Sequence, residues 1–454
     1  MALQTINPAN GDVVKEFASW TDSELDRVLS LVADETPAWA TRSIAERSAL
    51  IRKAGEVLRK NSDKYASLIS LEMGKLKREA LAEIEKCAFA CDYYSEHADD
   101  YLADEEIKTD AGRSLITYLP LGTILAVMPW NFPFWQVLRF AISTITAGNT
   151  VVLKHASNVP QSALAIEDVF REAGFPANVF TTLMIGASQV KAVIEDPRIH
   201  GVTLTGSEAA GRIVASQAGA AMKKSVLELG GSDPFIVLED CDMDWTVSQA
   251  VASRFGNCGQ VCIAAKRFIL VDSIADEFVQ RFKTGVEDLV IGDPADEATS
   301  IGPMSRVDLR DELDQQVQDS IKAGAKVLTG CAPVEGPGAY YQPSLLDHVK
   351  PGMRAYDEEF FGPVGIIIRV KDEMEAIRVA NDSRFGLGSS IWTQNIEKGE
   401  SLSRLLHTGS TFINGLVKSD PRLPVGGVRA SGYGRELSRV GMHEWCNIKT
   451  LWIK

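Results

Sequence analysis

The spacing of apolar positions divides the chain into a helical first part and a longer part in which strands and helices alternate. Residues 21–101 predict helix, because apolar side chains recur at intervals of three and four residues with charged residues between them. The pattern changes over residues 114–128. There, Ser-Leu-Ile-Thr-Tyr-Leu-Pro predicts a partly exposed strand, and Thr-Ile-Leu-Ala-Val-Met predicts a buried strand that ends at Pro129.

Short apolar strands then alternate with helices as far as residue 228. The pattern predicts strands at 151–153, 179–185, 201–205 and 224–228, and helices at 161–173, 188–196 and 207–219. This alternation is typical of βαβ units, which build a parallel, doubly wound sheet.

A second α/β segment follows without a low-complexity linker or a tandem repeat. Strands are predicted at 235–238, 268–271, 326–328 and 365–370, and helices at 244–255, 275–289 and 307–323. The last nine residues, Cys-Asn-Ile-Lys-Thr-Leu-Trp-Ile-Lys, alternate like a strand. A terminal strand needs a partner, and the sheet edge of another subunit is one way to supply it.

Composition and charge narrow the class of protein. The chain has 454 residues, 45% hydrophobic and 24% charged, which gives room for two or three domains. Its net charge of −14 disfavours nucleic acid and anionic membranes as partners. Seven cysteines without a disulfide-scaffold spacing indicate a reducing compartment, and no zinc pattern is present. The N-terminus lacks the features of a signal peptide, and we expect a cytoplasmic enzyme or binding protein with no metal.

The segment Phe255-Gly-Asn-Cys-Gly-Gln-Val-Cys262 places two cysteines among glycines and amides. A cysteine is ordinarily a small buried hydrophobe. Here the glycines thin the packing and the amides bring dipoles close to sulfur. A run of this kind after a helix can present a thiol to a cleft, where a lowered pKa would make it a nucleophile.

Four other motifs carry chemistry together with that thiol, although each also has an ordinary structural interpretation. Asn131 in Pro-Trp-Asn-Phe-Pro could donate to an oxyanion or form a turn. Glu228 in Leu-Glu-Leu-Gly-Gly could be a general base or an acidic residue at a sheet edge. Residues 205–211, Thr-Gly-Ser-Glu-Ala-Ala-Gly, form a glycine turn before a helix and could hold a phosphate. Residues 358–363, Glu-Glu-Phe-Phe-Gly-Pro, read alone as a loop.

In order and spacing, these five motifs resemble the aldehyde dehydrogenase superfamily over nearly the whole chain. The resemblance implies an α/β fold with a doubly wound dinucleotide-binding domain (1–101 and 121–229), an α/β catalytic domain (230–426) and a small β oligomerisation arm (102–120 and 427–454). It also implies Cys262 as the nucleophile, Glu228 as the base and Asn131 as the oxyanion donor, acting with the Cys262 backbone N–H. The cofactor-binding positions that it implies are Trp130, Gly206, Ser207, Glu359 and Phe361.

The implied chemistry is the oxidation of an aldehyde. The thiolate adds to the aldehyde carbon, hydride leaves to a nicotinamide, and the thiohemiacetal becomes a thioester that Glu228 hydrolyses with an activated water. Sulfur suits both halves of this sequence, because it attacks readily and leaves readily.

The cofactor expectation rests on Val151-Val-Leu-Lys-His-Ala-Ser157, which resembles the family's adenosine-ribose site. Lys154 matches the family pattern, whereas His155 replaces its usual proline. Many NAD-preferring members have glutamate where this chain has Ser157, and that carboxylate repels a 2′-phosphate. We therefore expect NADP to be preferred and NAD to be accepted; the alternative is that Ser157 is a loop residue without influence.

The substrate expectation rests on Arg139, eight residues after Asn131 on the next helix. An isolated arginine is usually a solvated cation or one at the edge of a core. In enzymes that resemble succinate-semialdehyde dehydrogenase, however, an arginine at this spacing holds the distal carboxylate and a serine assists it, here Ser419. Trp135 and Phe132 would wall the aldehyde channel. Some members have a second arginine six residues before the nucleophile, where this chain has Gly256.

The segments Leu-Lys-His-Ala-Ser-Asn (153–158) and Leu-Glu-Leu-Gly-Gly-Ser-Asp-Pro (227–234), together with the short chain, resemble more closely the compact bacterial semialdehyde dehydrogenases. The resemblance thus implies succinate semialdehyde, a small anionic aldehyde, as substrate and a homodimer or homotetramer. Other aliphatic aldehydes or semialdehydes remain alternatives, as does a cofactor-free thiol esterase that uses Cys262 and Glu228 alone. Cys258 could wall the tunnel or form a disulfide with Cys262 under oxidation.

Overall fold

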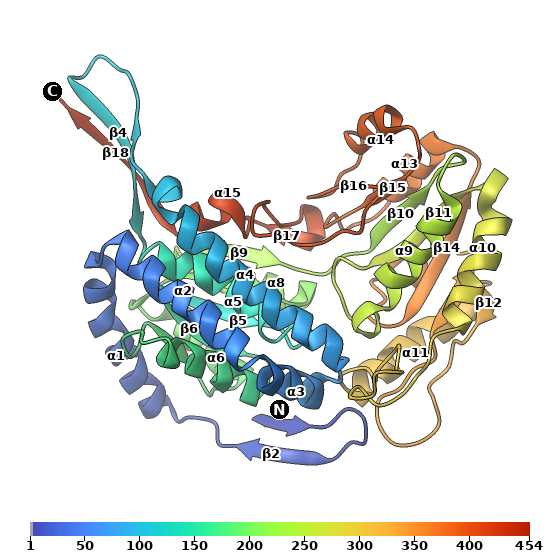
Figure 1. Cartoon of the computed structure of the whole chain (residues 1–454), viewed down its shortest axis with the longest axis horizontal. Helices are drawn as coiled ribbons and strands as arrows, with labels where there is room; N and C mark the ends of the chain where they lie inside the picture. The colour runs from blue at the N-terminus through green and yellow to red at the C-terminus, as the bar shows by residue number, and fades with distance from the viewer. Residues whose placement is uncertain (1–2) are drawn as a thin grey trace.

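The computed structural model describes residues 3–454, which form two α/β lobes and a projecting β arm (Figure 1). Four helices fill most of the region predicted to be helical: α1 (Asp22–Thr41), α2 (Ile44–Lys60), α3 (Ser62–Met73) and α4 (Lys77–Leu102). Capping boxes begin the first two, with Thr21 and Glu24 at α1 and Ser43 and Glu46 at α2. An N-terminal hairpin that the sequence did not predict precedes them, β1 (Leu3–Ile6) with β2 (Val13–Phe17).

The first lobe contains a six-stranded sheet of order β17-β9-β8-β5-β6-β7, parallel except for β17. Its strands are β5 (Thr123–Met128), β6 (Thr150–His155), β7 (Phe180–Thr182), β8 (Ile199–Thr205), β9 (Lys224–Glu228) and β17 (Gly432–Tyr433). The intervening helices are α5 (Trp135–Thr146), α6 (Pro160–Glu172), α7 (Val190–Glu195), which follows the short 3-10 turn η1 (Ala187–Gln189), and α8 (Glu208–Ala220).

Helices cover both faces of this sheet, as the doubly wound prediction requires. Along β5, Ile124 and Ala126 pack into a core shared with α2 to α6, whereas Leu125 packs into a second core with α1, α7 and α8. Alternate side chains of a strand point to opposite faces, so two cores are needed.

The second lobe contains a seven-stranded sheet of order β12-β13-β14-β11-β10-β15-β16, in which only β12 is antiparallel. Its strands are β10 (Asp233–Val237), β11 (Ala265–Val271), β12 (Lys326–Thr329), β13 (Ser344–Asp347), β14 (Val364–Val370), β15 (Ser390–Trp392) and β16 (Phe412–Ile413). Its helices are α9 (Met243–Phe255), α10 (Asp272–Glu287), α11 (Val307–Lys322), α12 (Arg354–Asp357), α13 (Glu373–Asn381) and α14 (Ile396–Ser403).

Several short elements escaped the sequence pattern. Strands β13, β15, β16 and β17 have between two and four residues, too few for a period of two to be recognisable. The chain leaves the second sheet at β16, returns to the first sheet through the 3-10 turn η3 (Arg429–Ser431) and β17, and continues into α15 (Ser438–His443). This return places C-terminal residues beside the end of β9.

The arm is a three-stranded antiparallel sheet of order β18-β4-β3, made of β18 (Cys446–Ile453), β4 (Arg113–Pro120) and β3 (Glu105–Glu106). The terminal strand therefore finds its first partner, β4, within its own chain. The other edge of β18 pairs with no strand of residues 3–454. Figure 1 shows β4 and β18 extending away from the body of the molecule, with the C-terminus at the tip of the arm.

Candidate active site

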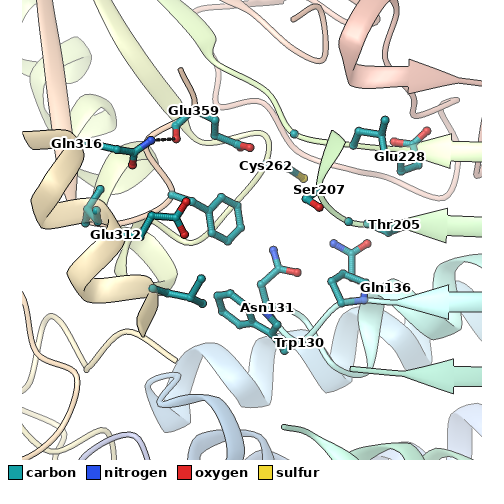
Figure 2. A pocket seen from close by; sticks show the side chains of 17 residues that line it. Trp130, Asn131, Gln136, Thr205, Ser207, Glu228, Cys262, Glu312, Gln316 and Glu359 are labelled. Carbon is teal, nitrogen blue, oxygen red and sulfur yellow. Dashed lines mark hydrogen bonds between the residues drawn. The ribbon is translucent and has the colours of Figure 1, made fainter. Parts of the chain in front are cut away.

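Two neighbouring cavities between the lobes share three lining residues: Cys262, Glu228 and Gln136. The first cavity, of about 300 Å³, is shown in Figure 2 and lies against the ends of β8 and β9 and against α11. The second, of about 350 Å³, lies between α4, α5, the Cys262 segment and the chain around Ser419. A thiol and a carboxylate thus stand where the two cavities meet.

The segment that carries Cys262 has an unusual backbone. Helix α9 ends at Phe255, and the 3-10 turn η2 (Gly256–Gly259) follows, with Asn257 and Cys258 at φ of 52° and 53°. Non-glycine residues are rare in this left-handed region, so the surrounding structure must hold them there. Glu79 on α4 accepts a hydrogen bond from the Asn257 backbone N–H at 3.1 Å. The buried guanidinium of Arg254 donates to the carbonyls of Gly259 and Gly362.

The Asn131 loop is tied directly to this segment. Nδ2 of Asn131 donates to the Gln260 carbonyl at 3.0 Å, and Nδ2 of Asn257 donates to the Asn131 carbonyl at 2.9 Å. Asn131 is 3% exposed, and Figure 2 shows its amide directed into the cavity below Cys262. The amide group and the thiol therefore face a common space, as an oxyanion donor and a nucleophile require.

The surroundings of Cys262 favour the neutral form of its thiol. Burial raises the pKa of Cys262 to about 11, although the nearby cations Arg139 and Lys266 favour the thiolate. This differs from the lowered pKa that the sequence suggested, because the glycine-rich segment is packed against both lobes rather than exposed. A base or a bound group must therefore assist ionisation.

Glu228 ends β9 and is 3% exposed. Burial raises its pKa, and the Arg139 guanidinium, whose Nη2 lies 4.0 Å from Oε2, opposes the rise. Its other oxygen, Oε1, has no hydrogen-bond partner among residues 3–454. A carboxylate of raised pKa with an unoccupied oxygen suits a general base that binds a water molecule.

The first cavity has features that fit a dinucleotide. Ser207 caps the N-terminus of the thirteen-residue helix α8. Thr205, Gly206 and Ser207 all line the cavity, so the start of the helix faces it. The rings of Trp130 and Phe361 pack edge to face, with their centroids 5.8 Å apart, and form an aromatic wall of the cavity. Glu359 enters from the second lobe, where Oε1 accepts from the Gly231 N–H at 3.1 Å and forms an ion pair with Lys266 Nζ at 3.1 Å.

Gly230 makes room for that carboxylate, because a Cβ on it would lie 2.1 Å from Glu359 Oε2. On the opposite side of the cavity from Glu228, Glu312 and Gln316 project from α11, and Gln316 donates to the Glu359 carbonyl (Figure 2). The two α11 residues are cavity positions that the sequence reading missed, since nothing local distinguishes them from surface residues of an amphipathic helix.

Lys154 and Ser157 lie outside the lining of both cavities. Lys154 is on β6 beside Val127 of β5, and Ser157 follows the end of β6, so both are at the carboxyl edge of the same parallel sheet. Burial lowers the pKa of Lys154. In open α/β sheets ligands bind outside this edge, which the first cavity also borders at Trp130 and Gly206.

The residue between them, His155, ties the strand to the Asn131 loop. Its Nδ1 accepts from the Ala156 N–H at 2.8 Å, so Nε2 carries the proton and donates to the Pro133 carbonyl at 2.9 Å. Burial lowers the pKa of His155 to about 4, which keeps the ring neutral. The sequence identified His155 only as a departure from proline.

The predicted substrate residues Arg139, Ser419, Trp135 and Phe132 all line the second cavity. Arg139 is buried, however, and already has carboxylate neighbours: Nε forms an ion pair with Glu436, and Nη2 faces Glu228. No sequence motif indicated Glu436, which only the return of the chain to the first sheet brings beside Arg139.

Cys258 does not share the surroundings of Cys262. It is 4% exposed, packs in the core of the second lobe and lines neither cavity, so it does not form the wall of the tunnel. Burial raises the pKa of its thiol well above the ordinary range. All seven cysteines have free thiols.

The described residues contain neither a metal-binding cluster nor a membrane-spanning helix. Residues 3–454 contain no group of three or more His, Cys, Asp or Glu side chains arranged to hold a metal ion. None of the helices in that part of the chain combines the length and apolar character needed to cross a bilayer.

Fold and site together define the class: an α/β protein of two lobes with a half-buried cysteine where two cavities meet. The model of the aldehyde dehydrogenase family matches residues 1–451. The chain belongs to this family, which confirms the resemblance and the predicted fold class.

Named relatives agree with that assignment. The chain is 49% identical over 453 residues to a probable NADP(+) succinate-semialdehyde dehydrogenase of Synechocystis, with 100% of both chains covered. It is 46% identical to an Escherichia coli succinate semialdehyde dehydrogenase described as using NAD(P)+, over 99% of this chain and 97% of the relative. The crystal structure of succinic semialdehyde dehydrogenase from Streptococcus pyogenes with NADP+ matches with a TM-score of 0.98 at 39% identity, covering 100% of each chain.

Proposed function

We propose that this protein oxidises succinate semialdehyde to succinate with NADP as the preferred cofactor and NAD as an accepted one. One observation carries the proposal: Cys262 and Glu228 line both cavities, one with dinucleotide features and the other with cationic side chains. Relatives that cover the full chain and are named for this activity support it.

In this proposal the Cys262 thiol gives its proton to Glu228, which passes it on to solvent, and the thiolate attacks the aldehyde carbon from the junction of the cavities. Asn131 and the Cys262 backbone N–H stabilise the oxyanion of the thiohemiacetal. The nicotinamide, when bound in the first cavity between Trp130, Phe361 and Glu359, supplies the acceptor for the hydride. Glu228 then takes a proton from water, which hydrolyses the thioester on Cys262 and releases the carboxylic acid.

The remaining predicted residues divide between the two ligands. We propose that Gly206 and Ser207 contact the pyrophosphate at the start of α8, and that Lys154 and Ser157 contact the adenosine ribose and its 2′-phosphate. Arg139 and Ser419 would orient the substrate carboxylate, while Trp135 and Phe132 form the apolar walls of the second cavity.

The assembly and location belong to the same proposal. We infer that residues 1–101 and 121–229 act as the cofactor-binding domain, 230–426 as the catalytic domain, and 102–120 with 427–454 as an arm that joins subunits into a dimer or tetramer. The seven free thiols favour the reducing cytoplasm. We propose that Cys258 can form a disulfide with Cys262 under oxidation. Because Cys258 packs in the core of the second lobe, the turn η2 must rearrange before the two sulfurs meet.

A panel of aldehydes assayed with NAD and with NADP tests the proposed function. We expect kcat/KM to be highest for succinate semialdehyde, above butanal and glutarate semialdehyde, with absorbance at 340 nm rising only when nucleotide is present. A higher value for butanal would favour a neutral aliphatic aldehyde as substrate. Ester hydrolysis that proceeds without nucleotide while no aldehyde is oxidised would favour a thiol esterase instead.

A further inference from the structure

The second cavity contains one half-buried cation whose charge no carboxylate balances. Lys75 forms a buried ion pair with Glu83, and Arg139 faces both Glu436 and Glu228. Lys86, on α4, also lines this cavity, and no carboxylate oxygen of residues 3–454 lies within 4.0 Å of its Nζ.

Lys86 is held in position by neutral groups. Its Nζ donates to Ser419 Oγ at 2.7 Å and lies 4.4 Å from the centre of the Trp135 ring. The indole Nε1 of Trp135 donates to the same Ser419 oxygen at 3.0 Å. The cation is thus fixed by a hydroxyl and an aromatic face, which leave its charge unneutralised.

The Ser419 hydroxyl has a proton to give. Its oxygen already accepts from Lys86 and Trp135, and the hydroxyl donates to no acceptor among residues 3–454. A hydroxyl has one donor and two acceptor positions, so only its donor position is unused. An ammonium group and a free O–H side by side complement the two oxygens of a carboxylate.

The electrostatic surroundings of Lys86 are those of an anion subsite. The charged groups that face it are Glu83 on its own helix, Arg139 on α5 and Asp420 on the adjoining segment, with the neutral thiol of Cys87. Glu83 forms an ion pair with Lys75 and accepts hydrogen bonds from two backbone N–H groups. Asp420 forms an ion pair with Arg422, so both carboxylates have partners other than Lys86. Burial and the Arg139 charge lower the pKa of Lys86 to about 8, and a bound anion would relieve both costs.

The cavity is also open on the side of the nucleophile. At Gly256, a Cβ would meet only Glu79 Oε1, at 3.8 Å. No cation projects from this position, and Lys86 supplies a positive charge to the same cavity from α4 instead.

We propose that Lys86 Nζ and the Ser419 hydroxyl bind the distal carboxylate of the substrate, so that Lys86 determines the preference for an anionic aldehyde. This inference rests on the proposed function and extends it to a residue that the sequence motifs do not include. Arg139, whose charge is shared by Glu228 and Glu436, then contributes less to the attraction for that carboxylate than Lys86 does.

The test removes the charge of Lys86 while keeping an unbranched side chain that is only one atom shorter. We expect Lys86→Met to raise KM for succinate semialdehyde about 10- to 100-fold, the loss typical of a charge-assisted hydrogen bond, with little change for butanal. Lys86→Arg should restore most of the affinity. Lys418→Met removes a cation from the exposed rim of the same cavity and should raise KM several-fold less, because solvent screens that charge.

Binding of succinate without turnover provides a second measurement. We expect its inhibition constant against succinate semialdehyde to rise in Lys86→Met by a factor similar to that for KM. An equal loss with butanal, or equal effects of Lys86→Met and Lys418→Met, would overturn the inference. So would unchanged KM and succinate inhibition in Lys86→Met while the native enzyme prefers succinate semialdehyde, a result that leaves the proposed function standing. A native enzyme that does not oxidise succinate semialdehyde would overturn the proposed function itself.

Discussion

At the scale of single residues, burial shifts the pKa values of the ionisable groups in and beside the second cavity so that their neutral forms are favoured. It raises the pKa of Cys262 to about 11, raises that of Glu228 and lowers that of Lys86 to about 8. The resting site therefore tends toward neutral groups, and charge should develop there when ligands bring compensating groups. Substrate and cofactor would complete the site electrostatically as well as sterically.

Substrate affinity should depend on pH through Lys86. The ammonium form is present below pH 8 and is lost as the pH rises through 8, so the attraction for a carboxylate falls in the same range. We expect KM for succinate semialdehyde to rise by up to about tenfold per pH unit above 8. KM for butanal, measured in the same buffers, should stay nearly flat, and Lys86→Arg should move the rise to higher pH. Parallel profiles for the two aldehydes would contradict this prediction.

Cofactor preference should depend on Ser157. Ser157→Glu places a carboxylate where a 2′-phosphate is proposed to bind, and we expect kcat/KM with NADP to fall by at least about tenfold, or about 1.4 kcal/mol, while NAD is used as well or better. Ser157→Ala is the control, because it removes the hydroxyl without adding repulsion. Equal or better use of NAD by the native enzyme would show the prediction to be wrong.

At the scale of elements, helix α4 holds the catalytic loops in place from outside both sheets. Glu83 accepts hydrogen bonds from the backbone N–H groups of Phe134 and Trp135 and so caps α5, which has no side-chain cap of its own. One turn earlier, Glu79 holds the turn before Cys262. Helix α4 therefore fixes the position of α5, which carries Arg139 and Trp135, relative to that of Cys262.

Removing the Glu83 charge should destabilise the protein strongly. Glu83→Gln leaves the fully buried Lys75 without its partner, and we expect the free energy of unfolding to fall by about 3–5 kcal/mol. Urea unfolding followed by tryptophan fluorescence measures the change. Glu85→Gln, two residues along the same helix, breaks only an exposed ion pair with Arg59 and should change stability by at most about 1 kcal/mol. Similar losses in both variants would argue against a strong contribution of the buried ion pair between Glu83 and Lys75.

At the scale of the whole molecule, the projecting arm exposes apolar side chains and an unpaired strand edge. Ile448 is 58% exposed and Trp452 55% exposed on β18, and Leu119 is 40% exposed on β4. Exposed edges and apolar patches of this kind are usually covered. A second copy of the chain is the partner that the proposed arm would meet.

Charge on the arm should therefore lower the oligomeric state. We expect Ile448→Lys combined with Trp452→Lys to yield monomers in light scattering after size exclusion, because an interface cannot bury two unpaired ammonium groups cheaply. Lys449→Ala, on the same exposed strand, should leave the assembly unchanged. A native protein that is already monomeric would contradict the proposed arm.

Much of the fold followed from local patterns, and some of it could not. The helices of residues 21–101 and the strands around β5, β8, β9 and β11 were predicted, because long amphipathic or apolar runs fix their type. The predicted strand 179–185 shortens to β7 at the sheet edge, where only one neighbour pairs with it. Strands of two or three residues, such as β16 and β17, owe their existence to neighbours that pair with them.

The sequence by itself determined the chemical inventory: a cysteine among glycines, an asparagine between prolines, a glutamate at a strand end, and spacings that identified the family. Those signals are local, because backbone conformation limits which residues can stand there. Tertiary structure decided how charges are balanced. Glu436 reaches Arg139 only because the chain returns to the first sheet, and Lys86 faces Ser419 across 333 positions of sequence. Electrostatic energy depends on distance in space, so only the folded chain revealed that the half-buried Lys86 in the second cavity has no carboxylate to balance it.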